Sequence, residues 1–376
     1  MSVPSPWFDP DDDRMSRAAW SRMTEPDDLG AARLVTRYGA GPALGLVLSG
    51  GDRTVGVEDR WRARVAGLDP RRDLATLDRF RGRLIVPGDP EWPSLLDSLG
   101  ERRPFCLWAR GAARLSDAAR RAAAIVGARA STEYGEHTAR ELAFGCAERG
   151  ISVVSGAAYG IDAAAHLGAL ACGGPTVAVL ACGVDRPYPR GNVDLIERIA
   201  DEGLVVSEVP PGSAPTRNRF VHRNRLIAAL AAATVIVEAG WRSGASITAK
   251  EADALGRCLG AVPGPVTSAA SAGCHRLLRD GAICVTTAAE VAELVDPIGS
   301  AAVQQPPLVR ALHDDLPEVD LRVLDALPLR QPRPSTSLAA VAGLDLPTLA
   351  ASLGRLELLG LAVRTPRGWR RSPTSG

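Results

Sequence analysis

The chain has 376 residues, 46% of them hydrophobic, which is enough to bury a large core and to form two or three domains. Its 44 basic and 43 acidic residues nearly balance, so the net charge is only +1. No uninterrupted apolar run reaches the roughly 18 residues that a membrane span needs, and the first residues lack the pattern of a signal peptide. The seven cysteines never form a Cys-x-x-Cys pair, which argues against zinc and disulfide frameworks and favours a reducing, cytoplasmic location.

The first 80 residues predict a short tail followed by a helical domain. Residues 1–13 are acidic and proline-rich, and we expect them to be disordered. Apolar residues recur at helical spacing over 14–80, where segment 29–44 combines a helix, a glycine stop and a second helix with proline near its start. This pattern indicates a small domain of the SAM or helix-hairpin kind. Such units grip the DNA backbone in some proteins and form plain bundles in others, and the sequence leaves both open.

Residues 83–296 predict an α/β core. Short β-branched runs alternate there with helical segments, and the runs are apolar throughout. Strands of this kind, separated by helices of about 10–15 residues, indicate a mostly parallel sheet with helices on both faces. The expected strands are 123–127, 151–155, 176–180, 204–208, 234–238, 259–263 and 282–285.

The last part of the chain predicts a separate small domain. Residues 297–318 form a polar, proline-bearing linker. Over 319–376, three short helical patterns and a basic hairpin-like tail indicate a winged helix. The third helix carries a single basic residue, Arg355, and is otherwise apolar, which favours protein contact or weak DNA contact over transcription regulation.

Three glycine-rich turns follow predicted strands, at 127–135, 156–162 and 183–192. Glycine there lets a ligand approach the backbone, and the N-termini of the following helices favour anions. None matches the dinucleotide fingerprint, and the single lysine, Lys250, lies inside a predicted helix, so a phosphate-loop ATPase is excluded. A phosphate or a nucleic-acid backbone is the natural anion, although tight-turn packing is the commoner role for any one such glycine.

Four arginines lie within residues 217–225, and no acid occurs from 210 to 237. The segment falls between a predicted strand (204–209) and a predicted helix (225–231), so we expect a ligand-binding loop. Guanidinium groups pair with phosphate oxygens, and Phe220 offers a face for a base. The alternative is a solvated loop whose arginines pair with acids elsewhere, and composition does not separate the two.

Two further sets of polar residues are candidates for chemistry. Asp162 and His166 are four residues apart on one predicted helix, a spacing that suits a dyad. No nucleophile in an elbow motif accompanies them, which favours a tethering contact. Glu208 and Glu238 end strands at the same edge of the sheet and could do acid–base work, but we favour a role in anchoring the neighbouring arginines.

An ordered series of motifs resembles the DprA/Smf family of DNA-processing proteins. The order and spacing are specific over about 170 residues, and the resemblance extends more weakly to both terminal domains. The matching segments are residues 125–129 with 134–135, 155–166, 183 with 188–189, 207–208, 220–227, 237–239 with 243–244 and 247–249, 262–264, and 280–282.

The resemblance implies an extended Rossmann-like core that forms a homodimer and binds single-stranded DNA without being an enzyme. It implies protection of incoming strands during natural transformation and help in loading the RecA recombinase, with displacement of single-strand-binding protein. It implies no catalytic residue, metal, cofactor or membrane partner. Carried over residue by residue, the DNA pocket comprises Gly127, Arg129, Phe220, Arg223, Asn224, Arg225 and Lys250.

Two positions depart from the family pattern. Ala128 stands where the family often has serine, and Val221 where it often has proline. A missing serine hydroxyl removes one phosphate hydrogen bond, worth about 1 kcal/mol. Because the arginines remain, we expect binding to survive, and we expect Arg223→Ala with Arg225→Ala to abolish it while leaving the fold intact.

A second hypothesis is a nucleotide hydrolase acting on nucleoside monophosphates. The same architecture resembles a group of hydrolases that use a glycine-rich turn and a glutamate on the next helix. Residues 244–251 are a loose version of that arrangement, with Glu251 as the glutamate. This hypothesis predicts turnover that disappears in Glu251→Gln.

Overall fold

The computed structural model describes residues 8–51, 56–241, 243–296 and 316–372. The chain divides into two compact units, Met1–Val303 and Gln304–Gly376. Most of the expected tail (1–7) and most of the expected linker (297–315) lie outside the described residues.

The N-terminal region is helical, as the sequence predicts. Aspartate side chains cap three of its helices, because Asp12, Asp28 and Asp69 each accept a hydrogen bond from the backbone of the first turn. Trp20 and Trp61 pack edge to face with ring centroids 5.6 Å apart in the centre of the bundle. The helices are α1 (Asp13–Met23), α2 (Leu29–Tyr38), α3 (Ala40–Leu48), α4 (Asp59–Val65) and α5 (Pro70–Arg79). We call this set, with its connecting loops, the N-terminal helical module.

A nine-stranded sheet follows, in the order β1-β2-β6-β5-β4-β3-β7-β8-β9. Strands β3 to β9 run parallel, whereas β1 and β2 are antiparallel additions at one edge. The mostly parallel α/β fold is therefore confirmed. The strands are β1 (Gly82–Ile85), β2 (Leu107–Arg110), β3 (Ala122–Val126), β4 (Ser152–Ser155), β5 (Thr176–Leu180), β6 (Leu204–Ser207), β7 (Ala233–Ile236), β8 (Cys258–Ala261) and β9 (Ile283–Cys284).

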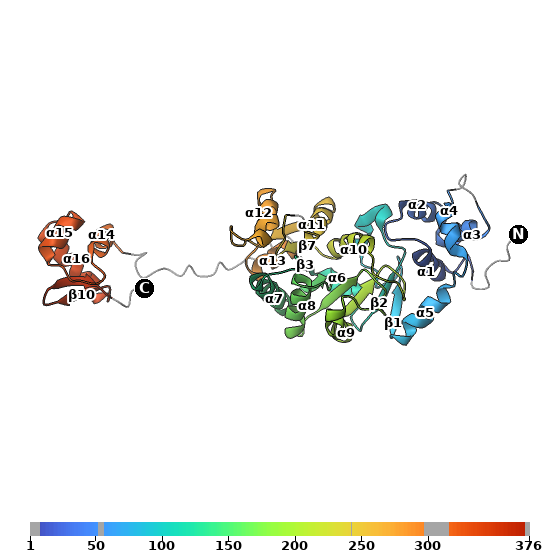
Figure 1. Ribbon diagram of the computed structural model, residues 1–376, viewed down its shortest axis with the longest axis horizontal. Helices are drawn as coiled ribbons and strands as arrows, with labels where there is room; N and C mark the ends of the chain where they lie inside the picture. The colour runs from blue at the N-terminus through green and yellow to red at the C-terminus, as the bar shows by residue number, and fades with distance from the viewer. Residues whose placement is uncertain (1–7, 52–55, 242, 297–315, 373–376) are drawn as a thin grey trace. The chain divides into compact units, whose positions relative to one another are not determined.

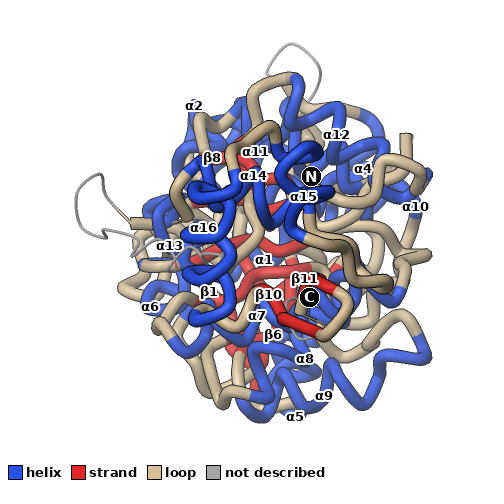
Figure 2. The backbone as a smooth tube through the Cα atoms, turned by 90° about the vertical axis from the view of Figure 1, so that its left-hand side faces the viewer, coloured by secondary structure: helices blue, strands red, loops and turns tan. Residues whose placement is uncertain are grey.

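Helices cover both faces of this sheet (Figures 1 and 2). One face packs against α6 (Leu115–Arg120), α10 (Arg217–Ala229), α11 (Ala245–Ala254) and α12 (Ala272–Arg279). The other packs against α7 (Glu133–Glu148), α8 (Ile161–Ala171), α9 (Val193–Glu202) and α13 (Ala288–Val295). A short 3-10 segment, η2 (Ser94–Arg102), lies between β1 and β2 in the chain.

Helix α10 corrects one expectation. The arginine-rich segment is helical from Arg217, not a loop followed by a helix at 225. Thr216 caps the helix by accepting a hydrogen bond from the backbone N–H of Arg219. The apolar periodicity is weak because Arg223 and Arg225 occupy buried positions that apolar residues would normally fill.

The C-terminal unit contains α14 (Glu318–Ala326), α15 (Ser335–Ala342), α16 (Leu346–Leu358) and the antiparallel pair β10 (Ala362–Thr365) and β11 (Gly368–Arg371). Its core is built from leucines of all three helices. The elements occur in the order that the sequence predicts, and their assignment as a winged helix stays a prediction.

Within the described ranges, no single helix has the length and apolar composition needed to cross a membrane. Helices α15 and α16 meet those thresholds only when taken together across a 101° bend.

Candidate functional site

A cavity of about 1070 Å³ opens at the carboxyl ends of the central strands. Its walls come from the turn after β3, from α10 and from the start of α11, so segments far apart in the chain converge there. Five of the seven predicted site residues line it: Gly127, Arg129, Phe220, Arg223 and Asn224.

Glu238 holds the glycine turn after β3 in place. Its carboxylate is buried and accepts hydrogen bonds from the backbone N–H of Thr132 at 2.9 Å and from the Thr132 hydroxyl at 2.6 Å. Its carbonyl oxygen also accepts the N–H of Ala128 at 2.7 Å. Glu238 therefore anchors the turn, not an arginine as expected.

The glycines of the first two turns are required by packing. A Cβ on Gly127 would lie 2.6 Å from Cγ1 of Ile161, and one on Gly156 would lie 2.0 Å from Nη1 of Arg223. Gly156 thus leaves room for a guanidinium group to reach the strand ends. The second turn shapes the site by admitting an arginine, which the sequence alone does not indicate.

Phe220 stands between two cations and a second aromatic ring. The guanidinium carbons of Arg129 and Arg223 lie 4.6 Å and 5.8 Å from its ring centroid, within the range of cation–π attraction. Tyr188, which is 43% exposed, places its ring centroid 5.8 Å away. Tyr188 also lines the cavity, although we did not predict it as a site residue. The cluster offers aromatic surface and positive charge side by side.

Arg223 is a buried cation with a carboxylate beside it. Its Nη1 donates to the carbonyl oxygens of Gly156 at 2.7 Å and Val179 at 2.5 Å, while its Nε finds no partner among the described residues. Burial lowers the pKa of Arg223 to about 10, against the opposing effect of Asp162. Burial likewise raises the pKa of the Asp162 carboxyl, which the charge of Arg223 opposes. Arg223 remains charged at neutral pH.

Asp162 and His166 do not bond to each other. The Asp162 carboxylate accepts the N–H of Gly156 at 3.2 Å, and Nδ1 of His166 lies 2.8 Å from the hydroxyl of Thr176. That hydroxyl donates to the carbonyl of Val153, so His166 Nδ1–H is the donor to Thr176. Both side chains tether the fold, as we favoured from the sequence.

We expect His166 to make the fold sensitive to acid. Burial, followed by the charge of Arg223, lowers its pKa to about 3. Between the ordinary histidine pKa of about 6.5 and this value, the unfolded chain binds a proton that the folded chain does not, so stability falls as pH falls. From pH 7 to 5 wild type should lose about 2 kcal/mol more unfolding free energy than His166→Asn.

Urea denaturation at the two pH values measures this difference. Asparagine can donate to Thr176 as the imidazole does, and the opposite titration of Asp162 is present in both proteins. An identical pH dependence for the two would contradict the assignment.

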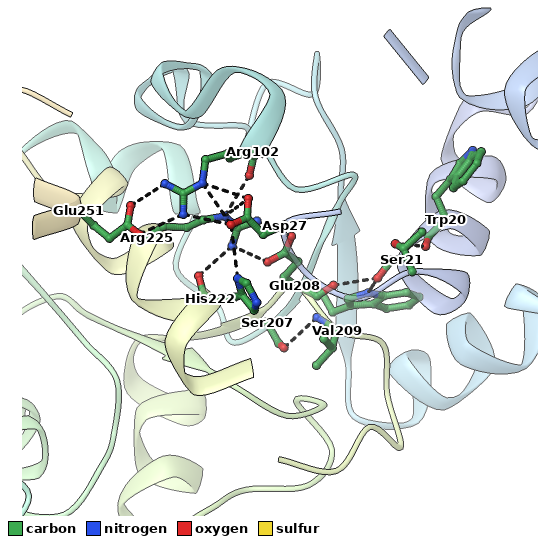
Figure 3. A network of polar contacts seen from close by, with 12 residues as sticks. Trp20, Ser21, Asp27, Arg102, Ser207, Glu208, Val209, His222, Arg225 and Glu251 are labelled. Carbon is green, nitrogen blue, oxygen red and sulfur yellow. Dashed lines mark hydrogen bonds and ion pairs between the residues drawn. The ribbon is translucent and has the colours of Figure 1, made fainter. Parts of the chain in front are cut away.

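Arg225 and Lys250 do not line the cavity. Arg225 is fully buried and donates to the carboxylate of Glu208 at 2.7 Å and 2.8 Å, and to the carbonyl of Arg102 at 3.0 Å (Figure 3). The expectation that Glu208 anchors an arginine is confirmed. Lys250 lies exposed on α11. The DNA contacts predicted for these two residues stay predictions.

Glu251 is bound to an arginine. Its two carboxylate oxygens accept hydrogen bonds from Arg102 at 2.8 Å and 3.0 Å, as Figure 3 shows. It does not line the cavity. Among the described residues, no group of three or more histidine, cysteine or acidic side chains is arranged to hold a metal ion.

Known proteins match more than half of this chain. A family model described as DNA recombination-mediator protein A matches residues 83–296. A Mycobacterium tuberculosis protein described as putative DNA processing protein DprA is 51% identical over 308 residues, 79% of each chain. An X-ray structure of DNA processing protein A from Streptococcus pneumoniae matches with a TM-score of 0.62 and 30% identity, covering 75% of this chain and 96% of the other.

A second solved structure is that of DNA processing protein A from Helicobacter pylori. That structure is described as giving insight into the unique single-stranded DNA binding mode of the Helicobacter pylori protein. It matches with a TM-score of 0.52 and 29% identity, over 57% of this chain and 95% of the other.

Proposed function

Because this chain belongs to the DNA recombination-mediator protein A family, we propose that it captures single-stranded DNA in the cavity beside α10. The observation that carries the proposal is the convergence on Phe220 of the guanidinium groups of Arg129 and Arg223. The single-stranded DNA binding mode described for the Helicobacter pylori protein supports it.

The chemistry of the cavity suits an unpaired strand. Bases stack on aromatic faces whatever their identity, and here Phe220 and Tyr188 present such faces. Exposed Arg129 and the amide of Asn224 are placed to bind the phosphates between the stacked bases. Buried Arg223 supplies fixed positive charge beneath them. A duplex keeps its bases stacked inside, so this site should prefer single strands.

We extend the proposal to the wider role of the family. The bound strand would be protected and passed to the RecA recombinase during transformation, and the protein would act as a homodimer through its α/β core. Family membership and the resemblance in the sequence support these parts of the proposal.

The test is fluorescence-anisotropy titration of a labelled single strand and of its duplex across a salt series. We expect tighter binding of the single strand and affinity that falls steeply with salt, because phosphate contacts release counterions. Weak binding by folded protein, or equal binding of both forms, would overturn the proposal.

Arg129→Ala should weaken single-strand binding and reduce the slope of log affinity against log salt by about 0.7, the amount for one lost phosphate contact. Arg129 is exposed and makes no ion pair with an acid in the described part of the chain, so its removal should leave the fold unchanged. Arg120→Ala is the control, because it removes the same charge from α6, outside the cavity. An unchanged slope in Arg129→Ala would argue against the phosphate contact.

The hydrolase hypothesis gains no support from the geometry. A catalytic base needs a carboxylate that can reach the bound nucleotide. Arg102 binds both oxygens of Glu251, which lies outside the cavity lining.

A further inference from the structure

Helix α10 contacts two parts of the protein with two sets of side chains. Phe220, Arg223 and Asn224 line the cavity. The interleaved positions Arg219 and Arg225, with His222, contact acids of the N-terminal helical module. The N-terminal helical module therefore contacts the helix that supplies most of the proposed DNA-binding side chains.

The acids come from the loop between α1 and α2. Glu25 accepts two hydrogen bonds from Arg219, at 2.8 Å and 3.1 Å. Asp27 lies 3.4 Å from Nδ1 of His222 and 3.9 Å from Nε of Arg225. Three positions spaced three residues apart along α10 thus contact one short loop.

Asp27 also connects α10 to the other wall of the cavity. It accepts hydrogen bonds from Nε and Nη2 of Arg102, at 3.0 Å and 3.1 Å. Arg102 in turn binds Glu251 on α11, whose first turn lines the cavity. Figure 3 shows Asp27, Arg102, Arg225 and Glu251 converging in one network.

The carboxylate of Asp27 is held in its charged form. Burial would raise its pKa, but hydrogen bonds from Arg102 and the charges of Arg225, Arg102 and His222 keep it below its ordinary value. The backbone of Asp27 has φ = +67°, a left-handed conformation that asparagine and aspartate tolerate better than other side chains.

The segment leading into α10 is fixed by the same module. Arg22 donates to the carbonyl of Pro211 at 2.6 Å, and the hydroxyl of Ser21 donates to the carbonyl of Glu208 at 2.8 Å. Both the segment before α10 and the helix itself are therefore hydrogen-bonded or ion-paired with α1 and the loop after it.

We propose that the N-terminal helical module completes the single-strand site, with Asp27 as a positioning residue that fixes α10 and so aligns Phe220, Arg223 and Asn224. This inference rests on the proposed function. It gives the module a role that its own sequence does not reveal.

Asp27→Asn tests the inference because long-range electrostatics and loss of positioning predict opposite changes in DNA affinity. Removing a negative charge near a DNA site should tighten binding if only long-range electrostatics matters. Loss of positioning should instead weaken single-strand binding by about five- to tenfold, a usual coupling between contacting residues. Asparagine tolerates the left-handed backbone, so the loop should keep its conformation.

Glu91→Gln is the matched control. Glu91 is a partly buried carboxylate that binds Arg83 and the N–H of Leu115, and within the described ranges it makes no hydrogen bond or ion pair with α10. Its neutralisation removes the same charge and should not weaken binding. Binding by Asp27→Asn that equals or exceeds that of wild type would overturn the inference.

Hydrogen exchange separates positioning from general loss of stability, and needs no DNA. In full-length Asp27→Asn, amides of α10 should exchange faster than in wild type, while those of α7 on the opposite face should not change. Unchanged exchange in α10 would also overturn the inference. If Asp27→Asn does not fold, Glu25→Gln replaces it, since that carboxylate is 47% exposed and also binds α10.

The two proposals fail differently. If wild-type protein does not bind single strands, the proposed function is wrong. Hydrogen exchange of the α10 amides in Asp27→Asn then still decides whether Asp27 positions the helix. Wild-type binding with an unaffected Asp27→Asn variant removes only the positioning.

Discussion

Phe220→Ala is expected to weaken single-stranded DNA binding by roughly 5- to 150-fold, the effect of losing about 1–3 kcal/mol of base stacking. The ring is half-buried between Arg129, Arg223 and Tyr188, so alanine removes both the stacking face and the surface that orders the two guanidinium groups. Anisotropy with a labelled single strand at fixed salt measures the change.

Two further substitutions show whether the aromatic face of Phe220 is responsible for the affinity for single-stranded DNA. Phe220→Leu keeps an apolar side chain of similar size but has no π face. This variant should therefore bind single-stranded DNA nearly as weakly as Phe220→Ala. Val221→Ala alters an exposed aliphatic neighbour that also lines the cavity, and should change affinity little. Full binding by Phe220→Leu would exclude stacking as the source of affinity.

Arg225→Ala is expected to lower the free energy of unfolding by about 3–5 kcal/mol, because it leaves the Glu208 carboxylate buried without its partner. Arg225 is fully buried, and only 12% of the Glu208 side chain is exposed. Chemical denaturation of the two proteins at neutral pH measures the difference.

Replacing both partners, as Arg225→Met with Glu208→Leu, should recover most of that stability, since an apolar pair leaves no unpaired charge. A loss below about 1 kcal/mol in Arg225→Ala would mean that the pair behaves like an exposed ion pair. Because Arg225 has this structural role, the variant that combines Arg223→Ala with Arg225→Ala would confound folding with binding. Arg129 and Phe220 are the better positions for testing DNA contact.

The sequence predicted those parts of the fold that depend on residues close together in the chain. Strands β3 to β7 are buried on both faces, so each is visible in the sequence as a short run rich in apolar and β-branched residues. Strands β1 and β2 were not predicted, since an arginine shortens the apolar run in each of them. The pairing of β2 with β6 depends on contacts between segments about 100 residues apart, and β1 pairs with β2.

The candidate site shows the same division. The resemblance to the family predicted five residues that line the cavity, and the family model confirms that resemblance. The sequence predicted a helix only from residue 225, since the arginines at buried positions disguise the helical pattern of the first part of α10. Nor did it predict that Arg219 binds Glu25, because 194 positions separate them in the chain. The concentration of arginines in the sequence indicated the segment, but only the fold divides these arginines between the cavity wall and internal ion pairs.

The family match begins at residue 83, but the structure does not begin a new folding unit there. The indole of Trp108 on β2 is fully buried, and its Nε1–H donates to the hydroxyl of Ser21 on α1 at 3.0 Å. Ala18 and Leu77 share a core cluster with this tryptophan and with Leu180 of β5. A fragment starting at residue 83 would uncover that cluster, so the segment that the family model matches leaves out part of the hydrophobic core on which its own strands pack.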